Sequence, residues 1–329
     1  MSTSIAVSPD ILRIDPAREV ERIVARIRQI VFKELNRRGA VIGVSGGIDS
    51  SVVAFLCAKA LGNERVLVLL APETDSSAES LRLGRMVAES LKVLSVVEDI
   101  SPILKAAGCY ERRDKAVRLA VSEYGDGYRF KIVLPNLIDE DRYPLFSVVV
   151  QSPDGQTRTS RLSAAAYLGI VAATNFKQRV RAMMEYYYAD LCQYAVAGTP
   201  NRLEYDQGFF VKLGDGAADF KPIAHLYKSQ VYQLASHLDV PEEIQRRKPT
   251  TDTYSLEQTQ EEFYFSLPLD KLDLCVYGKN NGIPPASMAP ATGLEIAQLE
   301  RIYAMIEAKR KVARYLHAAP LLIEEIEQH

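Results

Sequence analysis

Cysteine is scarce in this chain, and the few cysteines present follow no metal-binding or disulfide pattern. The 329 residues include four cysteines, Cys57, Cys109, Cys192 and Cys275, and no Cys-x-x-Cys pair occurs. Such wide spacing argues against a disulfide framework and against a cysteine-bound metal cluster. We therefore expect free, buried thiols in a reducing compartment.

The chain also lacks an excess of either charge and any long apolar run. Its 40 basic and 42 acidic residues leave a net charge of −2, so no overall electrostatic field would recruit nucleic acid. No apolar stretch is long enough to span a bilayer, and the first residues lack the basic region and apolar run of a secretory leader. We expect a soluble, cytoplasmic protein that binds neither nucleic acid nor membranes.

Apolar residues, by contrast, are plentiful enough for a large core. They make up 47% of the chain, and the length suits one domain covering residues 1–329. Short apolar runs predict buried strands at residues 41–44, 65–71, 93–97 and 194–197, with helical patterns between them. Buried strands joined by helices predict an α/β fold with a Rossmann-like, doubly wound parallel sheet.

Residues 110–162 have a different character from this α/β frame. Residues 129–134 and 145–151 are strand-like, and the Ser-Pro-Asp-Gly turn at 152–155 allows residues 156–162 to return as a partner strand. We predict that residues 110–162 form an insertion that contains a β-hairpin.

Helix is predicted again at residues 163–170 and, separately, at 175–191. Lys177, Arg179 and Arg181 then fall in the first turns of the second helix, where positive charge opposes the helix dipole. An anionic ligand nearby would explain these cations, although an ordinary charged helix start is the alternative.

A polar, glycine-bearing turn joins the first predicted strand to the helix over residues 52–61. The strand-turn-helix geometry points backbone N–H groups at an anion, and Gly46 and Gly47 let the backbone approach a phosphate closely. Ser45, Ser50 and Ser51 add hydroxyl groups, and Asp49 adds a carboxylate that could hold Mg²⁺. The turn therefore predicts a phosphate-binding loop, and a plain strand-helix connection is the alternative.

Two later segments should border the same crevice, because ligands of open α/β sheets bind beyond the carboxyl ends of the strands. Residues 72–80 follow the second strand, and residues 198–222 follow the strand at 194–197. The second segment is dense in glycine, acids and lysines, which favours a ligand loop over a run of surface turns.

The glycine turn resembles the pyrophosphate loop Ser-Gly-Gly-x-Asp-Ser of the N-type ATP pyrophosphatases, and no Gly-Lys-Ser/Thr closes it as in a Walker loop. The whole chain resembles the ammonia-dependent NAD⁺ synthetases over most of residues 20–315. The similar segments are 45–51, 72–80, 175–181, 198–222, 227–230, 249–252, 269–278 and 307–312.

The resemblance implies a two-step reaction. ATP adenylates the nicotinate carboxylate of deamido-NAD with release of pyrophosphate, and ammonia then displaces AMP to give NAD⁺. It also implies roles for individual residues. Asp49 and Glu204 would hold Mg²⁺, Lys228 and Thr250 would contact the β and γ phosphates, and Asp215 would orient or deprotonate ammonia. Ser45, Gly46, Gly47, Asp49, Ser50, Ser51, Ser77 and Thr199 would complete the ATP site, and Asn175, Arg179, Lys212, Asp219 and Lys309 would bind deamido-NAD.

The family further implies a homodimer, with the helix at 175–191 as a candidate interface and core packing as the alternative for its aromatic residues. Ammonia would come from solution or from a separate glutaminase. The insertion at 110–162, and Ala308 before Lys309 and Arg310, depart from the family pattern in regions used for the dinucleotide. An enzyme with the same adenylating core but another carboxylate or thiolation substrate is the second hypothesis. A non-catalytic nucleotide-binding protein ranks below it, because Asp49, Glu204 and Lys228 are present.

Overall fold

A twisted parallel sheet with helices on both faces forms the frame of the protein. The computed structural model describes residues 7–134, 146–251, 253–324 and 326. Within them the parallel sheet has four strands, β1 (Ala40–Gly43), β2 (Val66–Leu70), β3 (Leu94–Val97) and β7 (Ala195–Val196), in the order β3-β2-β1-β7. The predicted α/β fold with a parallel sheet is confirmed.

The order of the strands creates a switch point at β1. The chain moves outward from β1 to β2 and β3, and it returns later to place β7 on the other side of β1. Ile42 pairs with Val68 of β2, and Val41 pairs with Val196 of β7. In such sheets a crevice opens beyond the carboxyl end of the strand at the switch point, and the glycine loop follows β1 there.

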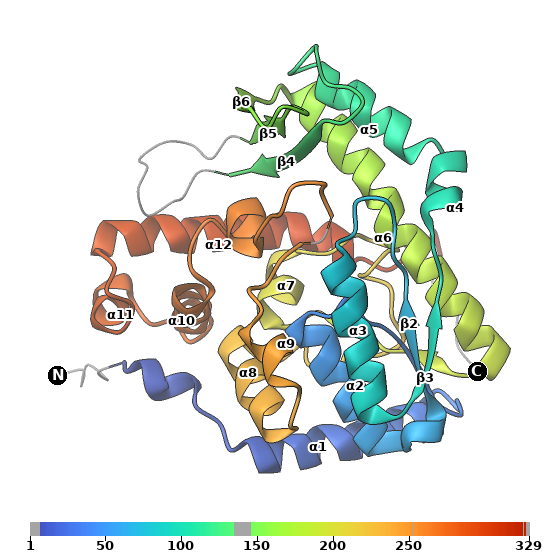
Figure 1. Ribbon diagram of the computed structural model, residues 1–329. Coiled ribbons are helices and arrows are strands. Elements are labelled where there is room, and N and C mark those ends of the chain that lie inside the picture. The colour runs from blue at the N-terminus through green and yellow to red at the C-terminus, as the bar shows by residue number, and fades with distance from the viewer. Residues whose placement is uncertain (1–6, 135–145, 252, 325, 327–329) are drawn as a thin grey trace.

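Both faces of the sheet are covered, which explains why its inner strands are apolar without alternation. Ala40, Ile42 and Val44 pack against four helices, α1 (Pro16–Gln29), α2 (Ile48–Leu61), α3 (Ala78–Leu91) and α8 (Lys228–His237). Val41 and Leu69 face the other way and pack against the end of α6 (Ala164–Cys192). Figure 1 shows α6 as a long helix that runs from the sheet toward the small β4–β6 sheet.

The prediction of two helices between residues 163 and 191 was wrong, because α6 is continuous. The polar pair Thr174-Asn175 does not interrupt it, since the Thr174 hydroxyl donates to the Ile170 carbonyl at 3.0 Å within the helix. Lys177 therefore lies in the middle of α6 rather than at its start, and it is fully buried between Glu73 and Asp75. Because the helix does not start near residue 175, the helix dipole gives no reason to expect an anionic ligand beside these cations.

A second group of helices packs against the frame on its own apolar core. The group consists of α7 (Arg202–Gln207), α10 (Leu269–Asn280), α11 (Pro285–Thr292) and α12 (Ile296–His317). Two further short helices, α4 (Ser101–Ala106) and α9 (Glu242–Arg246), lie outside it. Leu203, Leu272 and Ile306 belong to this core. The group places α7 and the residues before α10 beside the crevice.

The predicted hairpin is present as β5 (Ser147–Gln151) and β6 (Thr157–Arg161), which pair antiparallel. β4 (Arg129–Val133) pairs with β5 on its other edge, so the small sheet has a further strand. Phe130 and Val148 pack on α5 (Cys109–Arg118) and α6 through Val117 and Ile170. Residues 135–145 of the predicted insertion lie outside the described residues.

The structure bears on the cysteines and on possible membrane-spanning helices. The four cysteines are unpaired, and Cys57, Cys109 and Cys275 are buried. In the described part of the chain, none of the helices combines the length and the apolar character needed to cross a bilayer.

Replacing Ile42 by alanine tests the role of β1 in this frame. Ile42 is fully buried, so Ile42→Ala should lower the free energy of unfolding by about 2–5 kcal/mol through lost burial and the cavity left behind. The matched control is Ile296→Ala at the exposed start of α12, with a change within about 0.5 kcal/mol. Urea unfolding measures both, and equal losses would contradict this view of the core.

Candidate active site

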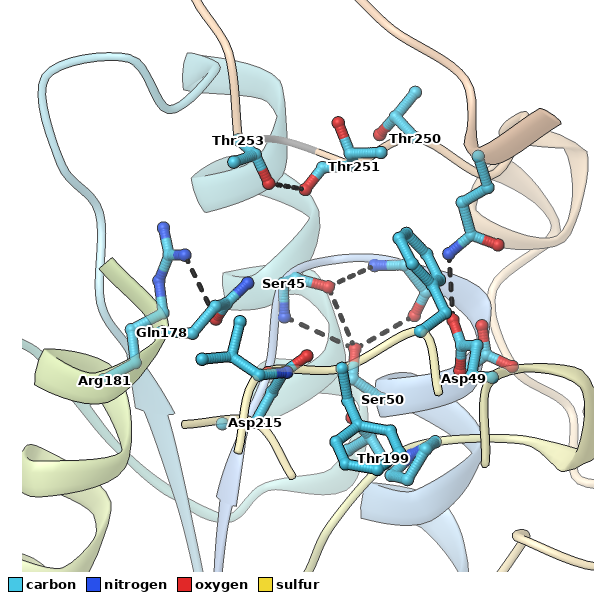
Figure 2. Close-up of a pocket in the computed structure, with 18 of the residues that line it drawn as sticks. Ser45, Asp49, Ser50, Gln178, Arg181, Thr199, Asp215, Thr250, Thr251 and Thr253 are labelled. Carbon is cyan, nitrogen blue, oxygen red and sulfur yellow. Dashed lines mark hydrogen bonds between the residues drawn. The ribbon is translucent and has the colours of Figure 1, made fainter. Parts of the chain in front are cut away.

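A cavity of about 510 Å³ opens at the carboxyl ends of β1 and β2, between the sheet frame and the second helical group. Its walls come from the glycine loop, the segment after β2, one face of α6, the segment after β7 and residues 247–251, 253 and 254. In Figure 2, Ser45 and Ser50 of the glycine loop lie between the threonines at 250 and 251 and the side chains of Thr199 and Asp215, and all of these residues line the cavity. The cavity therefore lies at the switch point of the sheet.

Most of the residues predicted for ATP and metal binding meet around this cavity. They are Ser45, Gly47, Asp49, Ser50, Ser77, Thr199, Glu204, Lys228 and Thr250, together with Asp215 and Asn175. They come from segments up to about two hundred positions apart, which the fold brings to one edge of the sheet.

The glycine loop is held in shape by its own hydrogen bonds. Gly46 has φ +72°, and a Cβ there would lie 2.7 Å from the Leu83 side chain, so only glycine fits between the loop and α3. The Ser50 hydroxyl donates to the Gly47 carbonyl at 3.1 Å, and the buried Ser51 hydroxyl donates to the same carbonyl at 2.8 Å. Ser51 thus supports the loop, while Ser45 and Ser50 line the cavity.

A buried ion pair lies directly beside the loop. The Lys228 ammonium contacts the Asp49 carboxylate, and the Asn201 amide donates to the other oxygen of Asp49 at 3.0 Å. Asp273 accepts hydrogen bonds from the first backbone N–H groups of α8, at 3.0 Å from Lys228 and 2.7 Å from Ser229. Asp273 therefore fixes the start of the helix from which Lys228 reaches Asp49.

Glu204 is the third charged group of this cluster. Its carboxylate accepts from the Asn201 backbone N–H at 3.0 Å and from the Gln260 amide at 3.0 Å. Burial, and then the neighbouring Asp49, raise the pKa of Glu204, while Lys228 opposes the rise. Burial alone would lower the pKa of Lys228, but Asp49 and Glu204 outweigh it and hold that pKa above its usual value. The cluster is short of positive charge.

Asp215 also lines the cavity, from the loop between α7 and α8. Its carboxylate accepts from the Val211 backbone N–H at 2.8 Å. Loss of water around the carboxyl raises the pKa of Asp215 to about 6, although the Val211 hydrogen bond and the Arg181 charge lower it. A carboxylate with such a pKa is a stronger base than an ordinary aspartate.

Four of the residues predicted to bind the dinucleotide have partners within the protein instead of lining the cavity. Arg179 Nε donates to the Lys212 carbonyl at 3.4 Å, and Lys212 Nζ donates to carbonyls at the end of α12, Tyr315 O and Ala318 O, at 2.9 Å. Asp219 accepts from the Val196 backbone N–H at 2.8 Å. Lys309 contacts the Tyr264 carbonyl, and burial lowers its pKa to about 7. Their roles toward substrate stay predictions.

Sequence reasoning missed several groups that line the cavity. Arg247 and Lys248 lie on the wall that also carries Thr250, and Arg247 donates to the Ser80 hydroxyl at 2.8 Å. Their position just before the Pro-Thr-Thr segment was the available signal. Gln178 and Glu185 line the cavity from α6. Both lie within the helix predicted at residues 175–191, but the sequence pattern did not indicate which face of that helix meets the cavity. Asp252, at the edge of a segment that carries the resemblance, lies outside the described residues.

Comparison with known proteins gives the relationship of this chain. The sequence profile described as NAD synthase matches residues 19–123 and 152–313. An "NH(3)-dependent NAD(+) synthetase" of Rhizobium meliloti (strain 1021) is 57% identical over 324 residues, which cover 98% of this chain and 97% of the relative. One of the same name from Mesorhizobium japonicum is 56% identical over 315 residues, covering 96% of this chain and 99% of the relative.

Solved structures agree in fold. The NMN synthetase from Francisella tularensis matches with a TM-score of 0.64 at 22% identity and covers 94% of this chain and 98% of its own. The NH3-dependent NAD synthetase from Campylobacter jejuni matches with a TM-score of 0.62 at 23% identity, over 94% of this chain and all of its own. The profile leaves out residues 124–151, which include β4 and β5, while the boundaries of the predicted insertion stay a prediction. On the sequence matches, the chain belongs to the NAD synthase family.

Proposed function

We propose that this protein is a ligase that forms a C–N bond, converting deamido-NAD to NAD⁺ with ATP and ammonia. The observation that carries the proposal is the meeting of Asp49, Glu204 and Lys228 beside the glycine loop. Its chemical meaning is supported by 57% identity to an NH(3)-dependent NAD(+) synthetase over nearly the whole chain. The reaction would proceed through an adenylated carboxylate and release AMP and pyrophosphate.

The site suits the first step, in which two anions must meet. A carboxylate oxygen of deamido-NAD attacks the α phosphorus of ATP, and the bond to the β phosphate breaks with pyrophosphate as leaving group. The backbone of the glycine loop, the hydroxyls of Ser45 and Ser50 and the ammonium of Lys228 face the cavity and would hold the phosphates as charge shifts onto them. Thr250 would add a hydroxyl from the opposite wall, and Ser77 with Thr199 would border the adenosine.

The residues around Glu204 fit a bound Mg²⁺ ion. Two carboxylates, Asp49 and Glu204, share one lysine, and burial disfavours the charge of Glu204 until a cation balances it. The Gln260 side chain, whose amide already binds Glu204, leaves a buried carbonyl oxygen without a partner in the described part of the chain. Oxygen ligands of this kind suit Mg²⁺, which would neutralise phosphate charge, with Asp49 and Glu204 as its protein ligands.

Ammonia would attack the adenylated carbonyl beside Asp215, which lines the cavity. Asn175 lines the cavity and would contact deamido-NAD directly. To reach Arg179, Lys212, Asp219 and Lys309 as well, the dinucleotide would extend beyond the cavity. The protein would act in the cytoplasm and take ammonia from solution or from a separate glutaminase.

Substituting the buried ion pair tests this function. Asp49→Asn and Lys228→Met should each lower kcat for NAD⁺ formation at least roughly 100-fold, because each removes charge stabilisation that the transition state needs. The measurement is joint release of NAD⁺ and pyrophosphate from ATP, Mg²⁺, deamido-NAD and ammonium. The control is Asp239→Asn at an exposed position with φ +56°, which asparagine accepts; it should keep full activity.

The outcomes of this assay separate the hypotheses. Pyrophosphate release that depends on Asp49 but needs another carboxylate would keep the adenylating core and reject deamido-NAD. ATP binding without turnover of any carboxylate tested would contradict a ligase.

We also propose that two copies associate through α6 and the edge of the sheet. Met183, Tyr187 and Leu191 lie one turn apart on α6 and are more than half exposed, and Leu94 on the edge strand β3 is 64% exposed. Exposed apolar surface of this extent marks an interface, and a C₂ dimer is the commonest oligomer.

Charged residues on this surface should separate the copies. The double variant Met183→Asp/Tyr187→Asp should run as a monomer in light scattering where the unchanged protein runs as a dimer, because two carboxylates would be desolvated in the interface. Leu119→Asp, at a position 64% exposed near the end of α5, should leave the dimer intact. A dimer that survives the double variant would place the interface elsewhere.

A further inference from the structure

One buried acid on the wall of the cavity has no part in the function proposed above. Gln178, Arg181 and Glu185 follow one another at helical spacing on α6, and all three line the cavity. The Glu185 carboxyl lies against Gly43, the last residue of β1, where a Cβ would stand 2.1 Å from Glu185 Oε1. Glycine at position 43 therefore makes room for this carboxyl at the floor of the cavity, where the glycine loop begins.

The loop that carries Asp215 crosses the same part of α6. Gly214 packs on Gln178, where a Cβ at position 214 would lie 2.8 Å from Gln178 Cβ. At the other end of the loop, Asp219 accepts from the Tyr186 hydroxyl at 3.3 Å. Asp215 thus lies over the turns of α6 between Gln178 and Tyr186, and Figure 2 shows it on the same side of the cavity as Gln178 and Arg181.

No cation is bonded to either carboxyl within the part of the chain that the structure describes. The Arg181 guanidinium, the nearest positive group on α6, donates to the Ala71 carbonyl at 3.3 Å and to the Gln178 amide oxygen at 3.4 Å. Lys221 Nζ donates to the Gly216 carbonyl at 2.9 Å. Both cations therefore act on the two acids through space and not through a hydrogen bond.

The two acids lose their protons in different pH ranges. Burial, and then the Asp215 charge, raise the pKa of Glu185 to about 8, with Arg181 opposing. Asp215 keeps a pKa of about 6. Like carboxyls resist being ionised together. At neutral pH the pair therefore carries one negative charge, on Asp215, and it gains a second charge as the pH rises through about 8.

We propose that Glu185 is a positioning residue for the ammonia step, acting through Asp215: once Glu185 is ionised, its negative charge makes Asp215 a stronger base and draws ammonium to it. This role rests on the proposed function. Ammonium gives one proton to the Asp215 carboxylate, and the freed nitrogen lone pair attacks the adenylated carbonyl carbon. The carbon–oxygen bond to AMP then breaks with its electrons on the phosphate oxygen, and the second proton passes from nitrogen to solvent.

The variant Glu185→Gln keeps the size of the side chain and removes its titration. Below about pH 7, where Glu185 is protonated, kcat/KM for ammonium should stay within about twofold of the unchanged protein. At pH 9 it should fall about tenfold, the equivalent of one pKa unit of interaction, while KM for ATP stays constant. Glu98→Gln is the matched control, because Glu98 is a half-buried acid that is bound to the Tyr188 hydroxyl, about one turn further along α6, and does not line the cavity. The kcat/KM of Glu98→Gln for ammonium, divided by that of the unchanged protein, should not vary with pH.

Folding of the variant can be checked independently. Folding raises the pKa of Glu185 from 4.5 to about 8. The folded protein therefore loses stability as the pH rises through that range, because Glu185 ionises first in the unfolded state. Glu185→Gln should therefore unfold at the same or a higher temperature than the unchanged protein at pH 8. Glu185→Asp, which retains a titrating carboxyl, should restore part of the activity at pH 9.

If the kcat/KM of Glu185→Gln for ammonium, relative to the unchanged protein, is the same at every pH, the inference is overturned, even if the unchanged protein makes NAD⁺. Failure of the unchanged protein to make NAD⁺ from deamido-NAD would instead reject the proposed function on which the inference rests.

Discussion

The buried charge of Lys228 is the constraint on which the rest of the site depends. Its side chain is 3% exposed, and it is matched by Asp49 on α2 and by Glu204 on α7. Removing one partner from such a group costs about 3–5 kcal/mol, because the other charge stays buried and unpaired. The charge interactions of Lys228 therefore fix the second helical group against the sheet frame beside the cavity. The same three residues are those that phosphate and Mg²⁺ chemistry would use.

A second buried cluster holds the opposite wall. The Lys177 ammonium donates to Glu73 at 2.8 Å, to Asp75 at 2.6 Å and to the Thr253 carbonyl at 2.7 Å, and Arg113 of α5 completes it through Asp75. These contacts tie α6 to the segment after β2 and to the wall that carries Thr250. The continuity of α6 makes this possible, because one helix reaches from the sheet to this cluster and supplies Glu185 and Arg181 on the way.

Much of the cavity could be predicted because its residues follow strands. Ser45 and Asp49 come after β1, and Thr199 and Glu204 come after β7, so parallel pairing alone brings them to one edge. Residues carried by helices were harder to predict. Glu185 is a single acid among apolar and aromatic neighbours, and nothing in that pattern says that it faces Gly43 rather than solvent.

The sequence by itself determined the α/β class, the glycine loop after β1 and the family, because strand patterning, glycine positions and ordered motifs are local properties. Tertiary structure alone decided the length of α6, the burial of Lys177 and Lys228, and the placement of Glu185 and Asp215 on one cavity. Burial and long-range electrostatics depend on which distant segments surround a group. A residue's own neighbours in the chain do not report them.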